Sequence, residues 1–144
     1  MKIKRIKAHA LVVPLDAIYW VANEIIDRCG QIIVEVETDE GIVGYGTLHG
    51  RHIPAVLKLI EELDLFLKGM DAMAHEAIWK KVFDITTTSP GDYQIFNQPQ
   101  LFSSVNRQAL LIALGGIDIA LWDIKGKATN LPVWRLLGGT RNEI

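Results

Sequence analysis

Leu48–Ile53 is one of two short stretches in this chain of 144 residues whose side chains could bind a small molecule. It carries His49, Arg51 and His52 just before Pro54, a residue that favours the first turn of a helix. A guanidinium and two imidazoles at a helix N-terminus suit a carboxylate or hydroxyl group of a substrate. A His-x-x-His pair could instead recruit a metal ion, although no carboxylate or cysteine stands nearby in the sequence. The plainer alternative is three solvated polar residues in a loop.

The second stretch, Leu15–Gly30, is an apolar segment without a helical or strand period. Its most apolar part runs from Ile18 through Tyr19 and Trp20 to Val21. A bulky apolar loop is unusual, because loops are normally polar and exposed. We expect it either to pack on the core of its own domain or to form a lid whose aromatic tip, Tyr19 and Trp20, covers a ligand.

A third run, Ala113–Gly139, is rich in charged residues but predicts architecture rather than chemistry. Asp118 and Asp123 lie five positions apart, so they do not share a helix face and cannot form a joint metal site. We expect these aspartates to make hydrogen bonds at a helix end or between elements.

Three strands are predicted in the first third of the chain: Lys2–Val13, Gln31–Thr38 and Ile42–Thr47. The second strand alternates apolar and polar residues, which is typical of a half-buried strand. Between the last two strands, Asp39-Glu40-Gly41 predicts a tight turn with glycine at a position that needs positive φ. Together these features predict an antiparallel meander.

Two helices follow the strands. The first begins at Pro54 and ends at Gly69. The second is predicted to be capped by Asp71 and to break at Thr86–Pro90. Its expected buried side chains are Met73, Ala77, Ile78 and Val82, with Trp79 as a further candidate. The loop Thr86–Ser104 receives no assigned role.

The longest patterned element is a helix that Asn106 is expected to cap and that Asn130 or Leu131 ends ahead of Pro132. Its apolar stripe consists of Leu110, Leu114, Ile117, Leu121, Ile124 and Ala128. Gly115 and Gly116 inside it suggest close approach of another backbone. A short helix, Val133–Leu137, should follow and stop at Gly138-Gly139. Strands followed by helices predict an α+β domain, with the helices on one side of the sheet.

Composition bounds the possible partners and the compartment. A net charge of -2 gives no electrostatic case for nucleic acid or an anionic membrane. Cys29 is the only cysteine, so no internal disulfide forms, and a reducing cytoplasm is the simplest location. No apolar run reaches the roughly 18 residues that span a bilayer. The length of 144 residues suits a single domain, and 49% hydrophobic residues are enough to bury a core of ordinary size.

The run Ala113–Gly138 closely resembles the N-terminal signature of the mandelate racemase/muconate-lactonizing enzymes of the enolase superfamily. The matching positions are Ala113, Gly115, Gly116, Ile117, Asp118, Ala120, Leu121, Asp123, Ile124, Gly126, Lys127, Pro132, Val133, Leu136, Leu137 and Gly138. The resemblance implies the capping domain of that family, a three-stranded meander followed by a three- to four-helix bundle. It implies residues 1–138 as this domain and residues 139–144 as the start of the link to a (β/α) barrel absent from this chain.

The same resemblance implies an enzyme that abstracts the proton next to a carboxylate and stabilises the enediolate on Mg²⁺. In the family the metal ligands and catalytic bases project from the barrel, so this segment is expected to hold none of them and to be inactive alone. Lys125 and Lys127 lie in the signature helix and are not expected to be the catalytic lysine pair.

The capping domain of the family chooses the substrate through two loops that close over the barrel mouth. These correspond to Leu15–Gly30 and Leu48–Ile53, so the expected substrate contacts are Tyr19, Trp20, His49, Arg51 and His52. The polar candidates favour a sugar acid or another hydroxy acid, and hence a dehydratase or racemase, that is, a lyase or isomerase. A cycloisomerase or an amino-acid or dipeptide epimerase is the alternative.

Partners implied by the resemblance are a small carboxylate substrate, the protein's own barrel and further copies of the chain in a homo-oligomer. A different class of function is also open, in which the fold serves as a stand-alone, non-catalytic binding or assembly module. Such a module would have to cover the apolar face that normally meets the barrel.

Overall fold

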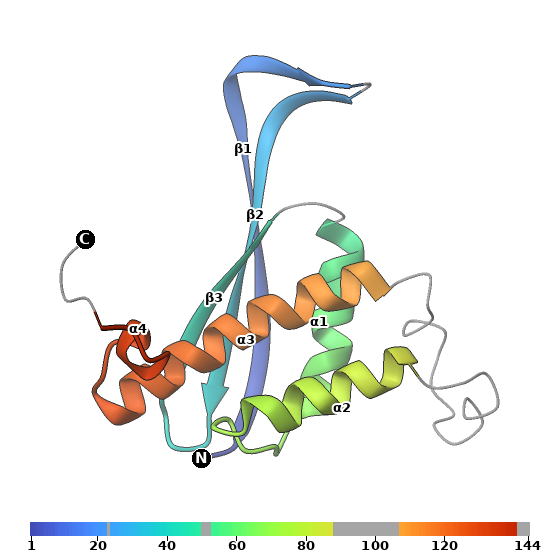
Figure 1. Cartoon of the computed structure of the whole chain (residues 1–144). Helices are drawn as coiled ribbons and strands as arrows, with labels where there is room; N and C mark the ends of the chain where they lie inside the picture. The colour runs from blue at the N-terminus through green and yellow to red at the C-terminus, as the bar shows by residue number, and fades with distance from the viewer. Residues whose placement is uncertain (23, 50–52, 88–106, 141–144) are drawn as a thin grey trace.

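The computed structural model describes residues 1–22, 24–49, 53–87 and 107–140. Three strands come first and four helices follow, as Figure 1 shows. The elements are β1 (Ile3–Val21), β2 (Glu24–Thr38), β3 (Val43–His49), α1 (Ile53–Leu67), α2 (His75–Thr87), α3 (Arg107–Thr129) and α4 (Val133–Leu136). The strands form an antiparallel sheet in the order β1-β2-β3, which confirms the predicted α+β fold and meander.

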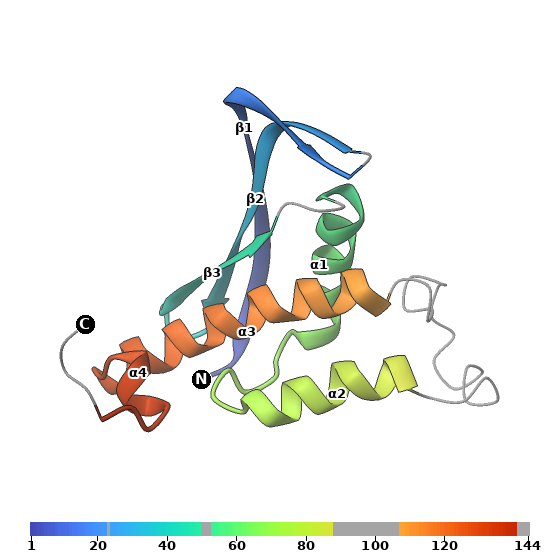
Figure 2. The same ribbon diagram turned by 45° about the horizontal axis from the view of Figure 1, so that its top comes forward.

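The core lies between one face of the sheet and the helices. The central strand β2 buries Ile32, Val34 and Val36 completely, and α3 meets them with Leu114 and Ile117. Helix α3 runs across β3 and β2 while α1 packs beside β1, an arrangement visible in Figures 1 and 2. The opposite face of the sheet carries ion pairs such as Lys7 with Glu35. Among the described residues, no helix is long and apolar enough to span a membrane.

Helix α3 and strand β3 approach so closely that the strand has room only for glycine at two positions. A Cβ placed on Gly46 would lie 2.0 Å from the carbonyl oxygen of Gly116, and one on Gly44 would lie 2.1 Å from that of Ala120. The predicted close approach is therefore confirmed at Gly116 and wrong at Gly115. A Cβ on Gly116 would meet the Leu48 side chain at 2.4 Å, whereas Gly115 has nothing within 4 Å.

Polar side chains from the helices cap backbone groups at both edges of the sheet. On β3, the Tyr45 N–H donates to Asp123 Oδ2 at 2.9 Å, and Lys127 Nζ donates to the Val43 carbonyl at 2.7 Å. Lys127 also pairs with Asp123 at 2.6 Å. On β1, the Ile6 N–H donates to Asp64 Oδ1. The expectation that Asp123 makes hydrogen bonds between elements is confirmed, because its carboxylate holds the edge of β3.

The prediction of an irregular loop over Leu15–Gly30 is wrong. β1 continues to Val21 and β2 begins at Glu24, so most of this segment is strand. Side chains on both faces of it are exposed, so the sequence shows no alternation. β3 is also longer than predicted, because His49 belongs to its last residues rather than to a loop. The Gly41 turn is confirmed, with φ of +85°.

Helix α2 starts later than predicted because residues before it pair with the N-terminus. Ile3 N–H donates to the Met70 carbonyl and Ala72 N–H to that of Met1, so Asp71 caps a turn through Met73 N–H instead of a helix. Ala77 is exposed, contrary to expectation, whereas Ile78 and Val82 are buried as predicted.

The other helix ends agree with prediction where they can be compared. Gly69 follows α1 with φ of +82°, and α3 ends just before Asn130, which has φ of +53°. The short helix ends at Leu136, one residue early, and Gly138 has φ of +81°. The expected cap at Asn106 and residues 88–104 of the unassigned loop lie outside the described residues.

His75, the first residue of α2, is a buried polar side chain that the sequence did not single out. Its exposed fraction is 7%, its ring stacks on Trp122 with centroids 4.5 Å apart, and its Nδ1 lies 3.5 Å from Asp118 Oδ1. That distance is long for a hydrogen bond. Burial lowers the pKa of His75 below its ordinary value of 6.5, and the nearby Asp118 carboxylate only partly opposes this. Lys125 also lowers the pKa, while Glu76 raises it.

Replacing Gly46 with alanine should destabilise the fold by about 3 kcal/mol, since the new methyl group would overlap backbone rather than a mobile side chain. Gly115→Ala is the matched control, because a Cβ there meets open space. This substitution should increase the free energy of unfolding by about 1 kcal/mol, since alanine has the higher helix propensity. Urea unfolding of the three proteins measures both changes. Equal effects of the two substitutions would contradict the close contact between α3 and β3.

The free energy of unfolding should fall as the pH drops below about 6.5, because the unfolded chain protonates His75 more readily than the folded one. His75→Phe keeps an aromatic ring beside Trp122 and removes the titrating group. The loss of stability between neutral pH and mildly acidic pH should therefore be smaller in this variant, as measured by urea unfolding at each pH. An unchanged pH dependence would exclude His75 as its source.

Candidate functional site

A two-stranded ribbon projects beyond the rest of the sheet. β3 ends at His49, which pairs with Gln31, and past that point β1 and β2 are the only described strands that remain paired. We call residues 12–22 and 24–30 the ribbon; it rises away from the helices in Figure 1 and bends over toward α1 in Figure 2. Its tip turns at Ala22, which has φ of +51°. The ribbon includes almost all of the predicted lid segment.

The bend in the ribbon comes from a break in strand register. Pro14 pairs with Arg28, but the next pair along β1 is Tyr19 with Ile26. Residues 15–18 of β1 therefore lie opposite residue 27 alone on β2. An insertion of this kind bends a strand pair and increases its twist. The bulge also explains why no period could be read from the sequence of this segment.

Both aromatic candidates stand at the tip of the ribbon and are exposed to solvent. Tyr19 is 57% exposed and Trp20 is 71% exposed, so neither packs on the core of this domain. They pair with Ile26 and Ile25, respectively. Because successive strand residues point to opposite faces, the two rings lie on different sides of the ribbon. A ligand held against one face would meet only one of them.

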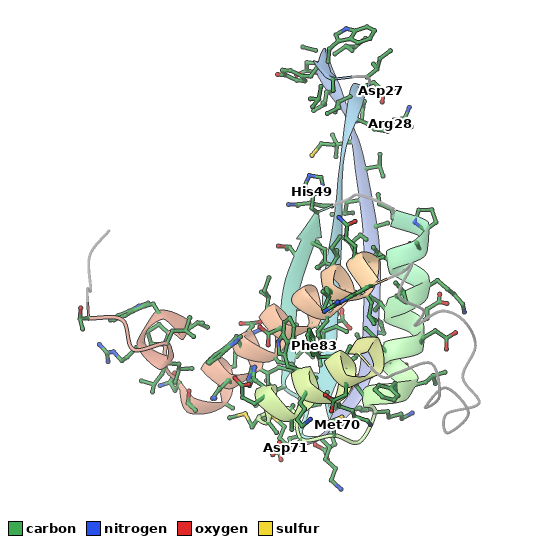
Figure 3. The ribbon with its side chains drawn as sticks, turned by 45° about the vertical axis from the view of Figure 1, so that its right-hand side comes forward. Asp27, Arg28, His49, Met70, Asp71 and Phe83 are labelled. Atoms are coloured by element: carbon green, nitrogen blue, oxygen red, sulfur yellow. The ribbon has the colours of Figure 1, made fainter. Side chains whose placement is uncertain are left out.

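The polar candidates are only partly placed. His49 is the last residue of β3 and lies at the base of the ribbon, as Figure 3 shows. Its partner across the sheet is Gln31. Arg51 and His52 lie outside the described residues, so the structure does not test whether the three side chains meet.

An ion pair on the ribbon, which the sequence did not single out, adds charge near its bend. Arg28 Nε and Nη2 donate to the two carboxylate oxygens of Asp27 at 2.8 and 2.9 Å. This bidentate contact lowers the pKa of Asp27 and raises that of Arg28. Both residues are exposed, and Figure 3 shows them in the upper part of the ribbon. The signal in the sequence that could have indicated this ion pair is that Asp27 and Arg28 are neighbours.

No metal centre is evident in the part of the chain that the structure describes. No group of three or more His, Cys, Asp or Glu side chains there could hold a metal ion. Asp118 and Asp123 have separate partners, His75 for the first and Tyr45 with Lys127 for the second. These two aspartates of α3 thus serve contacts between elements.

Comparison with known families gives one match that spans most of the chain. The family model described as "Mandelate racemase / muconate lactonizing enzyme, N-terminal domain" matches residues 13–138. This range includes the ribbon, the close contact between α3 and β3, and the short helix α4.

Curated relatives and solved structures show that the similarity covers only a part of longer proteins. D-galactarolactone cycloisomerase of Agrobacterium fabrum is 34% identical over 143 residues, which are 99% of this chain and 34% of the relative. D-galactonate dehydratase of Klebsiella pneumoniae is 38% identical over 110 residues, or 75% of this chain and 24% of the relative. The dipeptide epimerase of Enterococcus faecalis V583, solved with Mg and the dipeptide L-Leu-L-Tyr, is 28% identical with a TM-score of 0.75. The match covers all of this chain, 100%, and 36% of the epimerase. The chain therefore spans about a third or less of each of these proteins.

Proposed function

Because this chain belongs to the mandelate racemase/muconate lactonizing enzyme family of the enolase superfamily, as its N-terminal domain, we propose that it is the substrate-selecting cap of a larger enzyme. That enzyme removes the proton next to a carboxylate. The observation that carries the proposal is the family match over residues 13–138 in a chain about a third as long as its relatives. We place the domain boundary after Gly138, where the match ends, with residues 139–144 leading to the barrel.

The ribbon is the part of this domain that we propose as the lid. It carries exposed apolar side chains beyond the domain's own core, and its bulge directs the tip back over α1. An apolar lid excludes water when it closes over a substrate, which strengthens the electrostatic interactions beneath it. The proposed substrate contacts remain Tyr19 and Trp20, of which one face of the ribbon presents only one, together with His49 at the base of the ribbon and Arg51 and His52, which follow it in the sequence.

We propose a sugar acid or related hydroxy acid as the substrate and a dehydration as the reaction, in the cytoplasm. D-galactonate dehydratase supports this choice, as do the cationic and imidazole side chains of the stretch Leu48–Ile53, which suit carboxylate and hydroxyl groups. Cycloisomerisation is the second candidate, favoured by D-galactarolactone cycloisomerase, whose similarity extends over 99% of this chain.

Magnesium does not fit the described residues of this chain, since they offer no cluster of three possible ligands. We therefore propose that the barrel of the full-length enzyme holds the metal, together with the catalytic base. The dipeptide epimerase solved with Mg supports a metal in the parent enzyme.

In the full-length enzyme, only one of Tyr19→Ala and Trp20→Ala should strongly impair turnover, because the two rings lie on opposite faces of the ribbon. The variant that loses a substrate contact should lose about tenfold or more in kcat/KM, as expected when an apolar contact of 1–3 kcal/mol is removed. Steady-state kinetics on a panel of sugar acids measures the difference. Equal losses of kcat/KM in the two variants, or no loss in either, would contradict the proposal that one face of the ribbon covers the substrate.

The isolated chain should show no turnover of sugar acids in the presence of Mg²⁺. The full-length enzyme assayed on the same acids is the positive control. Robust turnover by the chain alone would overturn the proposal that it is a cap. If the isolated chain were a stable, soluble monomer without a barrel, that result would instead support a stand-alone binding module.

A further inference from the structure

One face of the ribbon continues the buried face of β2. Ile32 on β2 is completely buried in the core beneath the sheet. Side chains at every second position of a strand share one face, so Arg28 and Ile26 lie on the same face as Ile32. Tyr19 is the partner of Ile26 across the ribbon and therefore shares this face too. Burial agrees, because Ile26 is half-buried whereas Ile25 beside it is 56% exposed. Since the ribbon bends toward α1, which packs on the core side of the sheet, this face is the concave one.

The ion pair of Asp27 with Arg28 lies at a free edge of the ribbon. β3 pairs with β2 only as far as Gln31, and beyond this point no described strand covers the same edge of β2. The alternation of a strand directs neighbouring side chains apart, yet these two head groups meet in a bidentate contact. The two side chains are 50% and 66% exposed, and Figure 3 shows both on the side of the ribbon where α1 lies. The pair is therefore accessible to a molecule bound beneath the bend.

The pair offers hydrogen-bond donors and acceptors side by side without a net charge. Its contact lowers the pKa of Asp27 and raises that of Arg28, so both groups stay charged at neutral pH. The guanidinium retains N–H donors that the contact does not use, and the carboxylate oxygens can accept further hydrogen bonds. Neighbouring hydroxyl groups of a sugar chain both donate and accept, so they fit this arrangement. A second carboxylate fits it poorly, since it can only accept and is repelled by Asp27.

The fold itself makes little use of this pair. Exposed ion pairs generally add little stability, and two neighbours in the sequence join no separate elements. Asp123 and Lys127 on α3 differ in this respect, because they bind backbone groups of β3. A role in binding is therefore the better explanation for two charges held together on an otherwise apolar ribbon.

We propose that the Asp27–Arg28 pair binds hydroxyl groups at the end of the substrate that lies away from the reacting carboxylate. The pair thereby selects aldonic acids, which end in a hydroxymethyl group, over aldaric acids, which end in a second carboxylate. Tyr19 shares a face with Arg28 and is then the ring that covers the carbon chain, whereas Trp20 points away. This inference rests on the proposed function, because it requires the ribbon to close over a sugar acid.

Steady-state kinetics of the full-length enzyme on matched pairs of acids tests the selection. D-galactonate and galactarate share one carbon chain and differ only at its last carbon, and gluconate with glucarate makes a second pair. The kcat/KM for the aldonic acid should exceed that for the aldaric acid about tenfold or more. Asp27→Asn should lower this ratio about tenfold, because the repelling charge is lost. Arg28→Gln should lower kcat/KM for the aldonic acid without lowering the ratio, because Asp27 still repels the second carboxylate.

Two controls separate this role from an effect on the fold. A ratio of two substrates measured on one preparation does not depend on how much of the protein is folded. Lys80 and Asp84 form another exposed ion pair, on α2. Asp84→Asn breaks that pair and should leave the ratio unchanged.

The outcomes distinguish this inference from the proposed function. A ratio that favours the aldaric acid, or one that Asp27→Asn leaves unchanged or that both variants lower alike, would overturn this inference. A loss of turnover in Trp20→Ala rather than in Tyr19→Ala would overturn it as well, since the ribbon would then use its other face. The proposed function survives each of these results. No turnover of any sugar acid, or no effect of either aromatic substitution, would overturn both.

Discussion

The contact between α3 and β3 is the constraint on which the rest of this domain depends. The strand contributes Gly44 and Gly46, whose missing side chains let the carbonyls of Gly116 and Ala120 lie against the strand backbone. At these two positions the helix backbone lies directly against β3, while Leu114 and Ile117 pack against the side chains of β2. Asp123 and Lys127 then reach the outer edge of β3 and bind its backbone groups. One close approach thus fixes the core and closes one edge of the sheet.

The contact between α3 and β3 explains the role of the charged residue Asp123 of α3, while Asp118 of the same helix has another partner. Asp123 accepts from both Tyr45 N–H and Lys127, so replacing it would leave the Tyr45 N–H without its acceptor and Lys127 with only the Val43 carbonyl. Asp118 instead lies beside His75, which is buried against Trp122. Residues that look suited to acid–base chemistry therefore serve to join α3 to β3 and α2. The run that carries the family signature is therefore where α2, β3 and α4 meet α3.

Regular elements with one buried face could be predicted from the sequence, and the others could not. The alternation along β2, the turn at Gly41 and the helix ended by Asn130 all follow from local patterns, and the structure agrees with them. The ribbon could not be predicted, because both its faces are exposed and four residues of β1 lie opposite one residue of β2. Its sequence therefore shows no strand period. His75 and the role of Gly46 depend on contacts with residues far along the chain, which no local pattern reports.

The candidate site shows the same limit more sharply. Sequence reasoning selected Tyr19 and Trp20 as one pair, yet strand geometry puts them on opposite faces. The exposure of the two rings could be expected from the sequence. The strand register, which places them on opposite faces, could not. An apolar ribbon held by strand pairing alone, with little core beneath it, is expected to have low local stability when nothing covers it. That property suits a lid, because a segment that must open and close belongs to the least stable part of a fold.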